Sequence, residues 1–200
     1  MYWLKTFIQL ILILVTIGCK AQGITIVLED IDNYEFNEYS SAPRIAHVKD
    51  INNILGEYLG TWIGTHDGKS YEFRIIKHTL TVWNDYDYLE DILIMRYIIK
   101  DSNGAILEDT TNIPVGDPLD DLVIQGMFMR YDDNANPESY QLHYYGRDHK
   151  CGQDGDIVIK RVGAKLNLYY APSGEFITDC DKDTVENLLP PLGGFTLTKQ

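Results

Sequence analysis

The sequence predicts an all-β fold: an antiparallel meander that forms a closed or nearly closed barrel with one short N-terminal helix. The 200 residues include 14 tyrosines and 16 glycines, a composition typical of strands and tight turns. Short apolar runs alternate with turn sequences, which is the pattern of about nine or ten consecutive antiparallel strands. No β-α-β rhythm is present, which argues against a doubly wound nucleotide-binding fold.

The first residues of the chain predict export. Lys5 and the terminal amine precede an apolar run from Phe7 to Ile17, and Gly18 and Cys19 follow it. A charged start, an apolar core and a small residue at its end are the features of a signal peptide, here residues 1–18. The run is too short for a stable membrane anchor, which needs about 20 residues. We therefore expect an exported protein, in the bacterial cell envelope or secreted.

Cys19 admits two interpretations. Val15-Thr16-Ile17-Gly18 precedes it and resembles a lipobox with threonine at the −3 position, so that cleavage before Cys19 and lipidation of its thiol would attach the protein to a membrane through the lipid alone. The alternative is ordinary signal cleavage after Ala21. Either cleavage leaves Cys151 and Cys180, which an oxidising compartment favours as a disulfide.

The rest of the chain divides into a tether at residues 19–44 and a single domain at residues 45–200. Residues 24–28 can form one strand within the tether. In residues 45–58 apolar side chains recur every three or four positions, which predicts the amphipathic helix.

After the helix the chain alternates between strands and turns. Asp67-Gly68 is the strongest hairpin signal, because a type I′ turn needs positive φ at both central residues. Asp101-Ser102-Asn103-Gly104 predicts a second hairpin. Residues 91–100 and 122–130 are apolar on both faces. We expect the helix of residues 45–58 to cover the second face, and the alternative is an exposed apolar patch. The predicted strands are residues 61–66, 70–78, 91–100, 105–110, 122–130, 140–145, 156–162, 165–170, 175–178 and 195–199.

Charge and motifs limit the classes of function. The net charge of −13 predicts repulsion from nucleic acid and from anionic membrane surfaces. No serine lies in a G-x-S-x-G elbow and no glycine-rich phosphate loop occurs, so we expect neither catalysis nor a cofactor. The histidines show no close metal-binding spacing: His47, His66, His78, His143 and His149.

One acidic segment is a weak calcium candidate. Asp179, Asp181 and Asp183 place carboxylates at alternate positions, as a calcium-binding loop begins. Thr184 and Pro190 stand where such a loop has glycine and glutamate, and the alternative is that Asp183 caps a helical turn.

A disulfide between Cys151 and Cys180 would bring that segment close to a second acidic pair. Asp154 and Asp156 follow Cys151 directly in the sequence. The alternative for both acidic clusters is a solvated loop.

Gly60-Thr61-Trp62 resembles the G-x-W opening of lipocalin-like barrels. The resemblance implies structural roles for Gly60 and for Trp62, which would plug the closed end of a barrel. Asp67 and Gly68 are structural candidates through their hairpin turn. The sequence departs from that pattern, because a tight turn follows the strand and no arginine that would stack on the tryptophan is evident.

A closer resemblance links the chain to an uncharacterised family of small exported bacterial domains. It is carried by Lys49-Asp50-Ile51-Asn52-Asn53, Tyr58-Leu59-Gly60-Thr61-Trp62-Ile63-Gly64-Thr65, Asp67-Gly68-Lys69-Ser70-Tyr71-Glu72-Phe73, Asp101-Ser102-Asn103-Gly104 and Leu197-Thr198-Lys199-Gln200. The resemblance implies a signal peptide and a β-rich domain, and no activity.

The sequence thus predicts an exported, lipid-anchored, non-enzymatic β domain with a binding or envelope-structural role. A lipocalin-like carrier of a small apolar ligand is the first alternative, and a hydrolase is the second. A cavity inside the barrel would favour the carrier, whereas an interior filled with side chains would argue against it.

Overall fold

The computed structural model describes residues 23–28, 45–82, 88–113, 124–126, 139–146, 151–173, 188–190 and 194–200. These residues form strands and no α-helix, so the all-β prediction is confirmed. Within the same ranges, no helix has the length and apolarity needed to cross a membrane. The strands are β1 (Ile24–Val27), β2 (Ile45–Lys49), β3 (Gly60–His66), β4 (Lys69–Val82), β5 (Tyr88–Lys100), β6 (Ile106–Asp109), β7 (Ile124–Gly126), β8 (Ser139–Tyr145), β9 (Asp154–Val162), β10 (Lys165–Pro172) and β11 (Phe195–Lys199).

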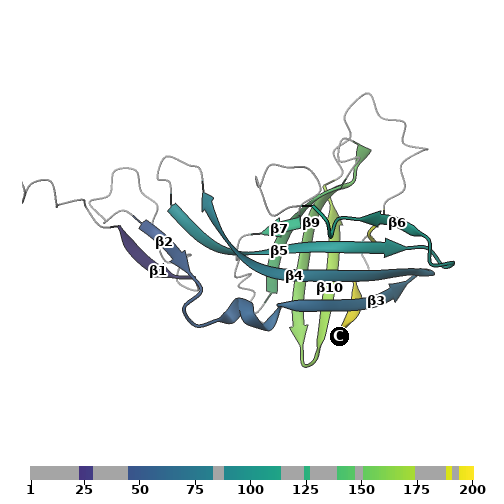
Figure 1. The fold of residues 1–200 in the computed structure, drawn as a ribbon, viewed down its shortest axis with the longest axis horizontal. Coiled ribbons are helices and arrows are strands. Elements are labelled where there is room, and N and C mark those ends of the chain that lie inside the picture. The colour runs from purple at the N-terminus through teal and green to yellow at the C-terminus, as the bar shows by residue number, and fades with distance from the viewer. Residues whose placement is uncertain are drawn as a thin grey trace, which may run out of the picture.

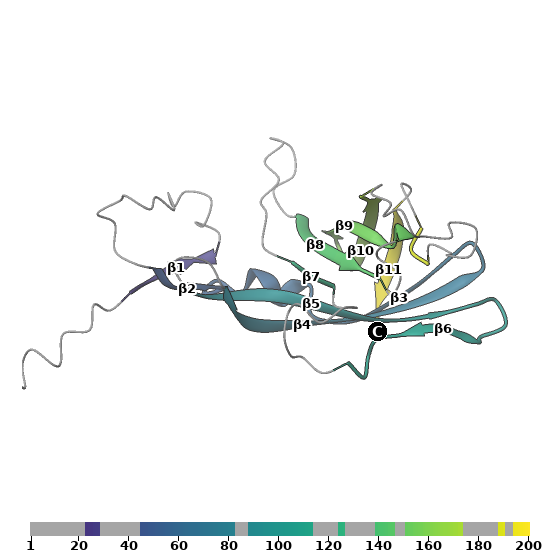
Figure 2. The same cartoon turned by 90° about the horizontal axis from the view of Figure 1, so that it is seen from above.

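All the strands belong to one mixed sheet (Figure 1). Its order is β1-β2-β5-β4-β3-β11-β10-β9-β8-β7, and β6 pairs with β5 outside this path. The pairings β1–β2 and β2–β5 are parallel, and the others are antiparallel. From above, β1 and β2 extend the sheet at one end, away from β8 to β11 (Figure 2).

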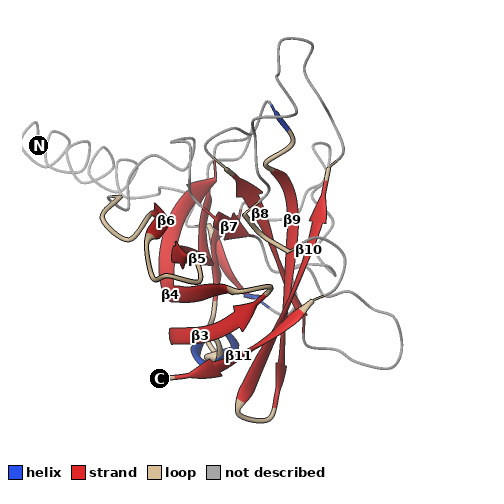
Figure 3. Cartoon of the chain, turned by 90° about the vertical axis from the view of Figure 1, so that its right-hand side faces the viewer, coloured by secondary structure: helices blue, strands red, loops and turns tan. Residues whose placement is uncertain are grey.

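The sequence predicts a closed or nearly closed barrel, and the sheet does not close into one. The sheet curves until β7 also pairs with β5 (Figure 3), but this seam consists of three residue pairs, and one pair joins β7 to β8. The reason lies in β5, whose 13 residues span about 43 Å. Along one edge it pairs in turn with β2, β7 and β6. Its first part therefore extends the sheet toward β1, and the result is a large mixed sheet.

The concave side of the sheet is filled with large side chains. Trp62, Phe73, Tyr97, Tyr144 and Leu168 have no accessible surface. Rings contact one another across the strands, for example Tyr97 with Tyr144 at 6.2 Å between ring centroids. Because this side is occupied by the protein's own side chains, it forms the hydrophobic core.

The helix predicted at residues 45–58 is absent. The structure has β2 there, followed by a single 3₁₀ turn at Ile54–Glu57. Asn53 has φ 57° in the left-handed region, and the Asp50 carboxylate accepts a hydrogen bond of 2.7 Å from the backbone N–H of Ile54. Ile45 and Val48 are three positions apart, which suits one face of a helix and not one face of a regular strand. In β2 the pairing with β1 is irregular between Ile45 and His47, which lets both side chains enter the same core, and the parallel neighbours β1 and β5 make the segment a strand.

The second face of β5 is not covered by residues 45–58. Ile45 and Val48 pack into the main core instead. Ile92 and Ile94 are buried on the opposite face, where the partly buried Leu80 packs against them. That expectation from the sequence was therefore wrong.

The hairpin turns follow local turn chemistry. Asp67 and Gly68 have φ 46° and 76° between β3 and β4, which is the backbone that a type I′ turn requires. Between β5 and β6, the Asp101 carboxylate accepts the N–H groups of Asn103 and Ala105 at 2.9 and 2.8 Å. These two turns place the ends of β3, β4, β5 and β6 side by side.

Candidate functional site

A hollow of about 350 Å³ lies on the outer face of the sheet, where β3, β4, β5 and β11 run side by side. Ile63, Glu72 and Ile98 form one cross-strand row in it, because Ile63 pairs with Glu72 and Glu72 pairs with Ile98. The next row is Thr65, Ser70 and Lys100 by the same pairings. We call this hollow, lined by Ile63, Gly64, Thr65, Ser70, Tyr71, Glu72, Ile98, Lys100 and Thr198, the outer hollow.

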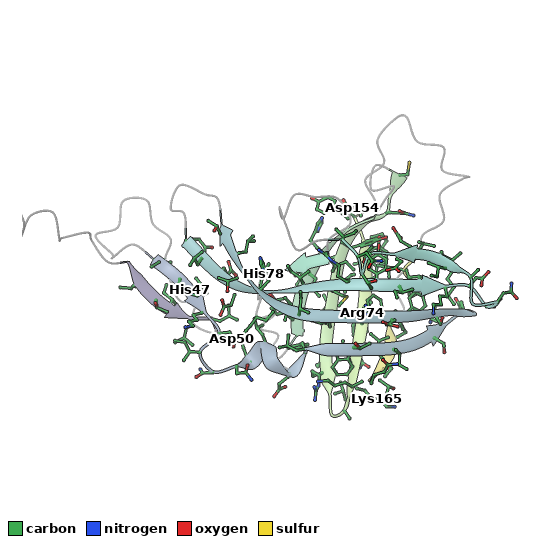
Figure 4. The ribbon with its side chains drawn as sticks, in the orientation of Figure 1. His47, Asp50, Arg74, His78, Asp154 and Lys165 are labelled. Carbon is green, nitrogen blue, oxygen red and sulfur yellow. The ribbon has the colours of Figure 1, made fainter. Side chains whose placement is uncertain are left out.

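The charged side chains of the outer hollow differ in whether they have a partner of opposite charge. Arg74, labelled on β4 in Figure 4, holds the Glu72 carboxylate. Its Nε and Nη2 both lie 2.7 Å from Glu72 Oε1. Asp109, opposite Ile98 on β6, accepts hydrogen bonds from Thr111. Its pKa is lowered chiefly by those bonds and further by the charges of Arg74 and Lys100. Among the described residues, the ammonium of Lys100 has no carboxylate partner at ion-pair distance. The hollow thus combines an available cation, hydroxyl groups and isoleucine walls.

A polar network joins β2 to β4 and β5. His47 Nε2 lies 3.0 Å from Asp91 Oδ1, and the Thr79 hydroxyl donates to the same oxygen at 2.9 Å. The backbone N–H of Asp50 donates to Asp91 Oδ2 at 3.1 Å, and the Lys77 ammonium pairs with the buried Asp50 carboxylate at 3.3 Å. Burial opposes ionisation of Asp91, but the hydrogen bonds from His47, Thr79 and Asp50 outweigh it, so that its pKa is lowered.

Glu90 lies beside this network and is fully buried. Burial raises its pKa to about 7; a hydrogen bond from Tyr88 counteracts this rise, and the charge of Asp91 adds to it. The Tyr88 hydroxyl lies 3.4 Å from Glu90 Oε2, while Oε1 has no hydrogen-bond partner among the described residues. Val48 of β2 pairs with Glu90 in one of the two residue pairs that join β2 to β5. The Glu90 carboxyl group, with a pKa of about 7, therefore belongs to the short pairing between β2 and β5.

A histidine lies between two carboxylates on the outer face of β8 and β9. His143 Nε2 is 3.0 Å from Asp154, and Nδ1 is 3.2 Å from Asp156. The Ser173 hydroxyl donates to the other oxygen of Asp154, and the Tyr145 ring packs edge-on against His143. Because the carboxylates lie at different ring nitrogens, they do not converge on one point. Within the described ranges, no three such side chains are placed to hold a metal ion.

Trp62 is fully buried, and two cationic side chains lie near its ring, one from β9 and one from β11. Its Nε1–H donates to the Tyr58 carbonyl at 2.7 Å. The Arg161 guanidinium lies 5.5 Å from the ring centroid, and the Lys199 ammonium lies 5.4 Å from it. Gly60 has φ 123°, and a Cβ there would meet the Lys199 side chain at 2.9 Å. Arg161 is thus the arginine beside the tryptophan that the sequence alone does not reveal, because 99 residues separate them.

Several predicted site residues lie outside the described residues. These are Cys19, Cys180, Asp179, Asp181 and Asp183, so lipidation, the disulfide and the weak calcium candidate remain predictions. Cys151 lies just before β9, three residues from Asp154. Asp154 and Asp156 meet around His143, a grouping that the sequence does not indicate because it depends on the register of β8 with β9.

Comparison with known proteins supports one conclusion. The model of a family of unknown function (DUF6705) matches residues 4–200, nearly the whole chain. No curated protein and no solved structure matches the chain.

Proposed function

Because the chain belongs to this family of unknown function, which supplies no activity, we propose a function from the geometry of the chain itself: an exported, lipid-anchored domain that binds a small ligand on the outside of its sheet. The observation that carries the proposal is the contrast between the two faces. The concave side is filled by buried rings, whereas the outer hollow is open and measures about 350 Å³. Ligand sites are concave and begin at about 300 Å³.

The filled core favours this proposal over a lipocalin-like carrier. A carrier holds its ligand between the strands, in the space that Trp62, Phe73 and Tyr97 occupy here. Emptying that space would cost several kcal/mol of stability for each large side chain displaced. The carrier therefore stays an alternative that needs a rearranged core, and the outer site needs none.

The side chains around the histidines favour binding over hydrolysis. The Thr79 hydroxyl donates to Asp91, and the Ser173 hydroxyl donates to Asp154. In both clusters the carboxylate accepts a hydrogen bond from the hydroxyl and also contacts the histidine ring. A nucleophile needs its hydroxyl against the base itself, so we propose that these groups are structural.

Mapping of ligand contacts tests the proposed binding. We expect a chemically diverse set of small molecules, added to the exported Cys19→Ala protein, to shift backbone amide NMR signals of residues that line the outer hollow. Signals of core residues such as Phe73 and Leu168 should not move. Shifts concentrated in the core would favour the carrier instead, and an unresponsive outer hollow would contradict the proposal.

Lipid attachment has a separate test. A fatty-acid analogue fed to the producing cells should label the wild-type protein and leave Cys19→Ala unlabelled, because only the thiol of Cys19 is available for acylation at the cleavage site. An unlabelled wild type that begins at Gln22 would establish ordinary cleavage after Ala21. A peptide map of the same protein without reductant would show whether Cys151 and Cys180 are joined.

A further inference from the structure

Lys100 is a cation of the outer hollow that, among the described residues, has no carboxylate within ion-pair distance. Glu72 is paired with Arg74. Asp109 accepts hydrogen bonds from Thr111, and the charge of Lys100 contributes to its lowered pKa without an ion pair between the two. Ser70 is paired directly with Lys100, and Thr65 follows Ser70 in the same row. A half-buried lysine with no carboxylate at ion-pair distance among the described residues, in a hollow that serine and threonine also line, suits an anionic group of a ligand.

The walls beside Lys100 are apolar. Ile98 is two residues away on β5 and faces the same side of the sheet, and Ile63 completes its row through Glu72. Ile106, on β6, pairs with Lys100 and is 60 % exposed. The exposed Ile63 and Ile106 and the half-buried Ile98 make a surface for a ligand that is apolar except at one end.

We propose that the outer hollow binds a small carboxylate amphiphile, with its carboxylate at Lys100 and its apolar chain along Ile63, Ile98 and Ile106. This inference rests on the proposed binding function and names the ligand class. The overall charge of −13 does not prevent it, because exposed charges farther away than about 8 Å are largely screened at physiological salt. A cationic ligand would lack a free carboxylate in the hollow, since Glu72 already pairs with Arg74.

Decanoate and decanol, each below its micelle concentration, test the inference because they differ only at the head group. Decanoate should shift amide signals of the outer hollow in exported Cys19→Ala protein, and Lys100→Gln should weaken its binding about tenfold or more, as loss of a charged hydrogen bond does. Decanol should bind more weakly and with the same affinity to both proteins. Lys49→Gln, which removes a charge from an exposed lysine of β2, is the matched control and should bind decanoate as the parent does.

The remaining outcomes separate the two levels of the proposal. Equal binding of decanoate and decanol, with no effect of Lys100→Gln, would overturn the carboxylate assignment and keep the hollow as a binding site. An equal loss in Lys49→Gln would show a general charge effect and would also overturn the assignment. If neither decanoate nor the diverse set shifts any signal of the hollow, the proposed function fails with the inference.

Discussion

Trp62→Ala should destabilise the protein by about 3–5 kcal/mol, the usual cost of emptying the site of a buried aromatic side chain. Trp62 is fully buried, its indole N–H is hydrogen-bonded to the Tyr58 carbonyl, and two cations lie near its ring. A domain's whole stability is about 5–15 kcal/mol, so the variant should unfold at much lower urea concentration or fail to accumulate.

A graded series keeps this prediction testable if Trp62→Ala does not fold. Trp62→Phe retains most of the packing and loses the hydrogen bond to Tyr58, so it should unfold at a urea midpoint between those of the wild type and the alanine variant. Arg161→Gln removes one of the two cations and leaves the ring buried, so it should have a smaller effect than Trp62→Ala. An alanine variant that unfolds cooperatively at the wild-type midpoint would contradict the placement of Trp62 in the core.

Glu90→Gln should make the protein more stable at pH 8.5 by up to about 3 kcal/mol, since a shift of one pKa unit is worth about 1.4 kcal/mol. The pKa of Glu90 rises from 4.5 to about 7 because the carboxyl group is buried. A raised folded-state pKa means that the folded protein binds the proton more tightly than the unfolded chain does. This contribution is complete below about pH 4.5 and is lost as pH rises through about 7.

Urea unfolding between pH 5 and pH 9 measures the effect. The wild type should lose stability across that range, and Glu90→Gln should lose much less. Asp91 has a lowered pKa, so its contribution is lost only in strong acid, and Tyr88, with a pKa near 12, titrates above the range. Glu57→Gln, at an exposed position of the 3₁₀ turn, is the control. Parallel profiles for wild type and Glu90→Gln would refute the assignment to this carboxyl group.

The sequence predicted the parts of the fold that local chemistry determines. Asp67-Gly68 specifies its turn through backbone φ, and Asp101 specifies the next turn through hydrogen bonds to residues two and four positions away. Strand content followed from composition and from the absence of a β-α-β rhythm. Membership in an uncharacterised family also followed from short motifs, and the family match confirms it.

The features that the sequence missed depend on distant strands. Ile45 and Val48 fit one face of a helix, and only their parallel pairing with β1 and β5 makes them a strand. Closure of the barrel was mispredicted because the length of β5 allows three partners along one edge. The outer hollow and the cluster around His143 arise from register across neighbouring strands. Periodicity within one segment carries no information about such pairings.

The position of β1 within the sheet has a consequence for the reach of the protein above a bilayer. If Cys19 carries the lipid, five residue steps separate the anchor from Ile24, and a chain of that length extends at most about 18 Å. If β1 were not part of the sheet, the linker would run from Cys19 to Ile45 and could extend about 90 Å. The four residues of β1 thus reduce the maximum length of the linker between anchor and sheet about fivefold. Lys100 lies about 36 Å along β5 from the pairing of that strand with β2. A lipid at Cys19 would therefore attach the protein at the β1–β2 end of the sheet, and the outer hollow lies at the opposite end.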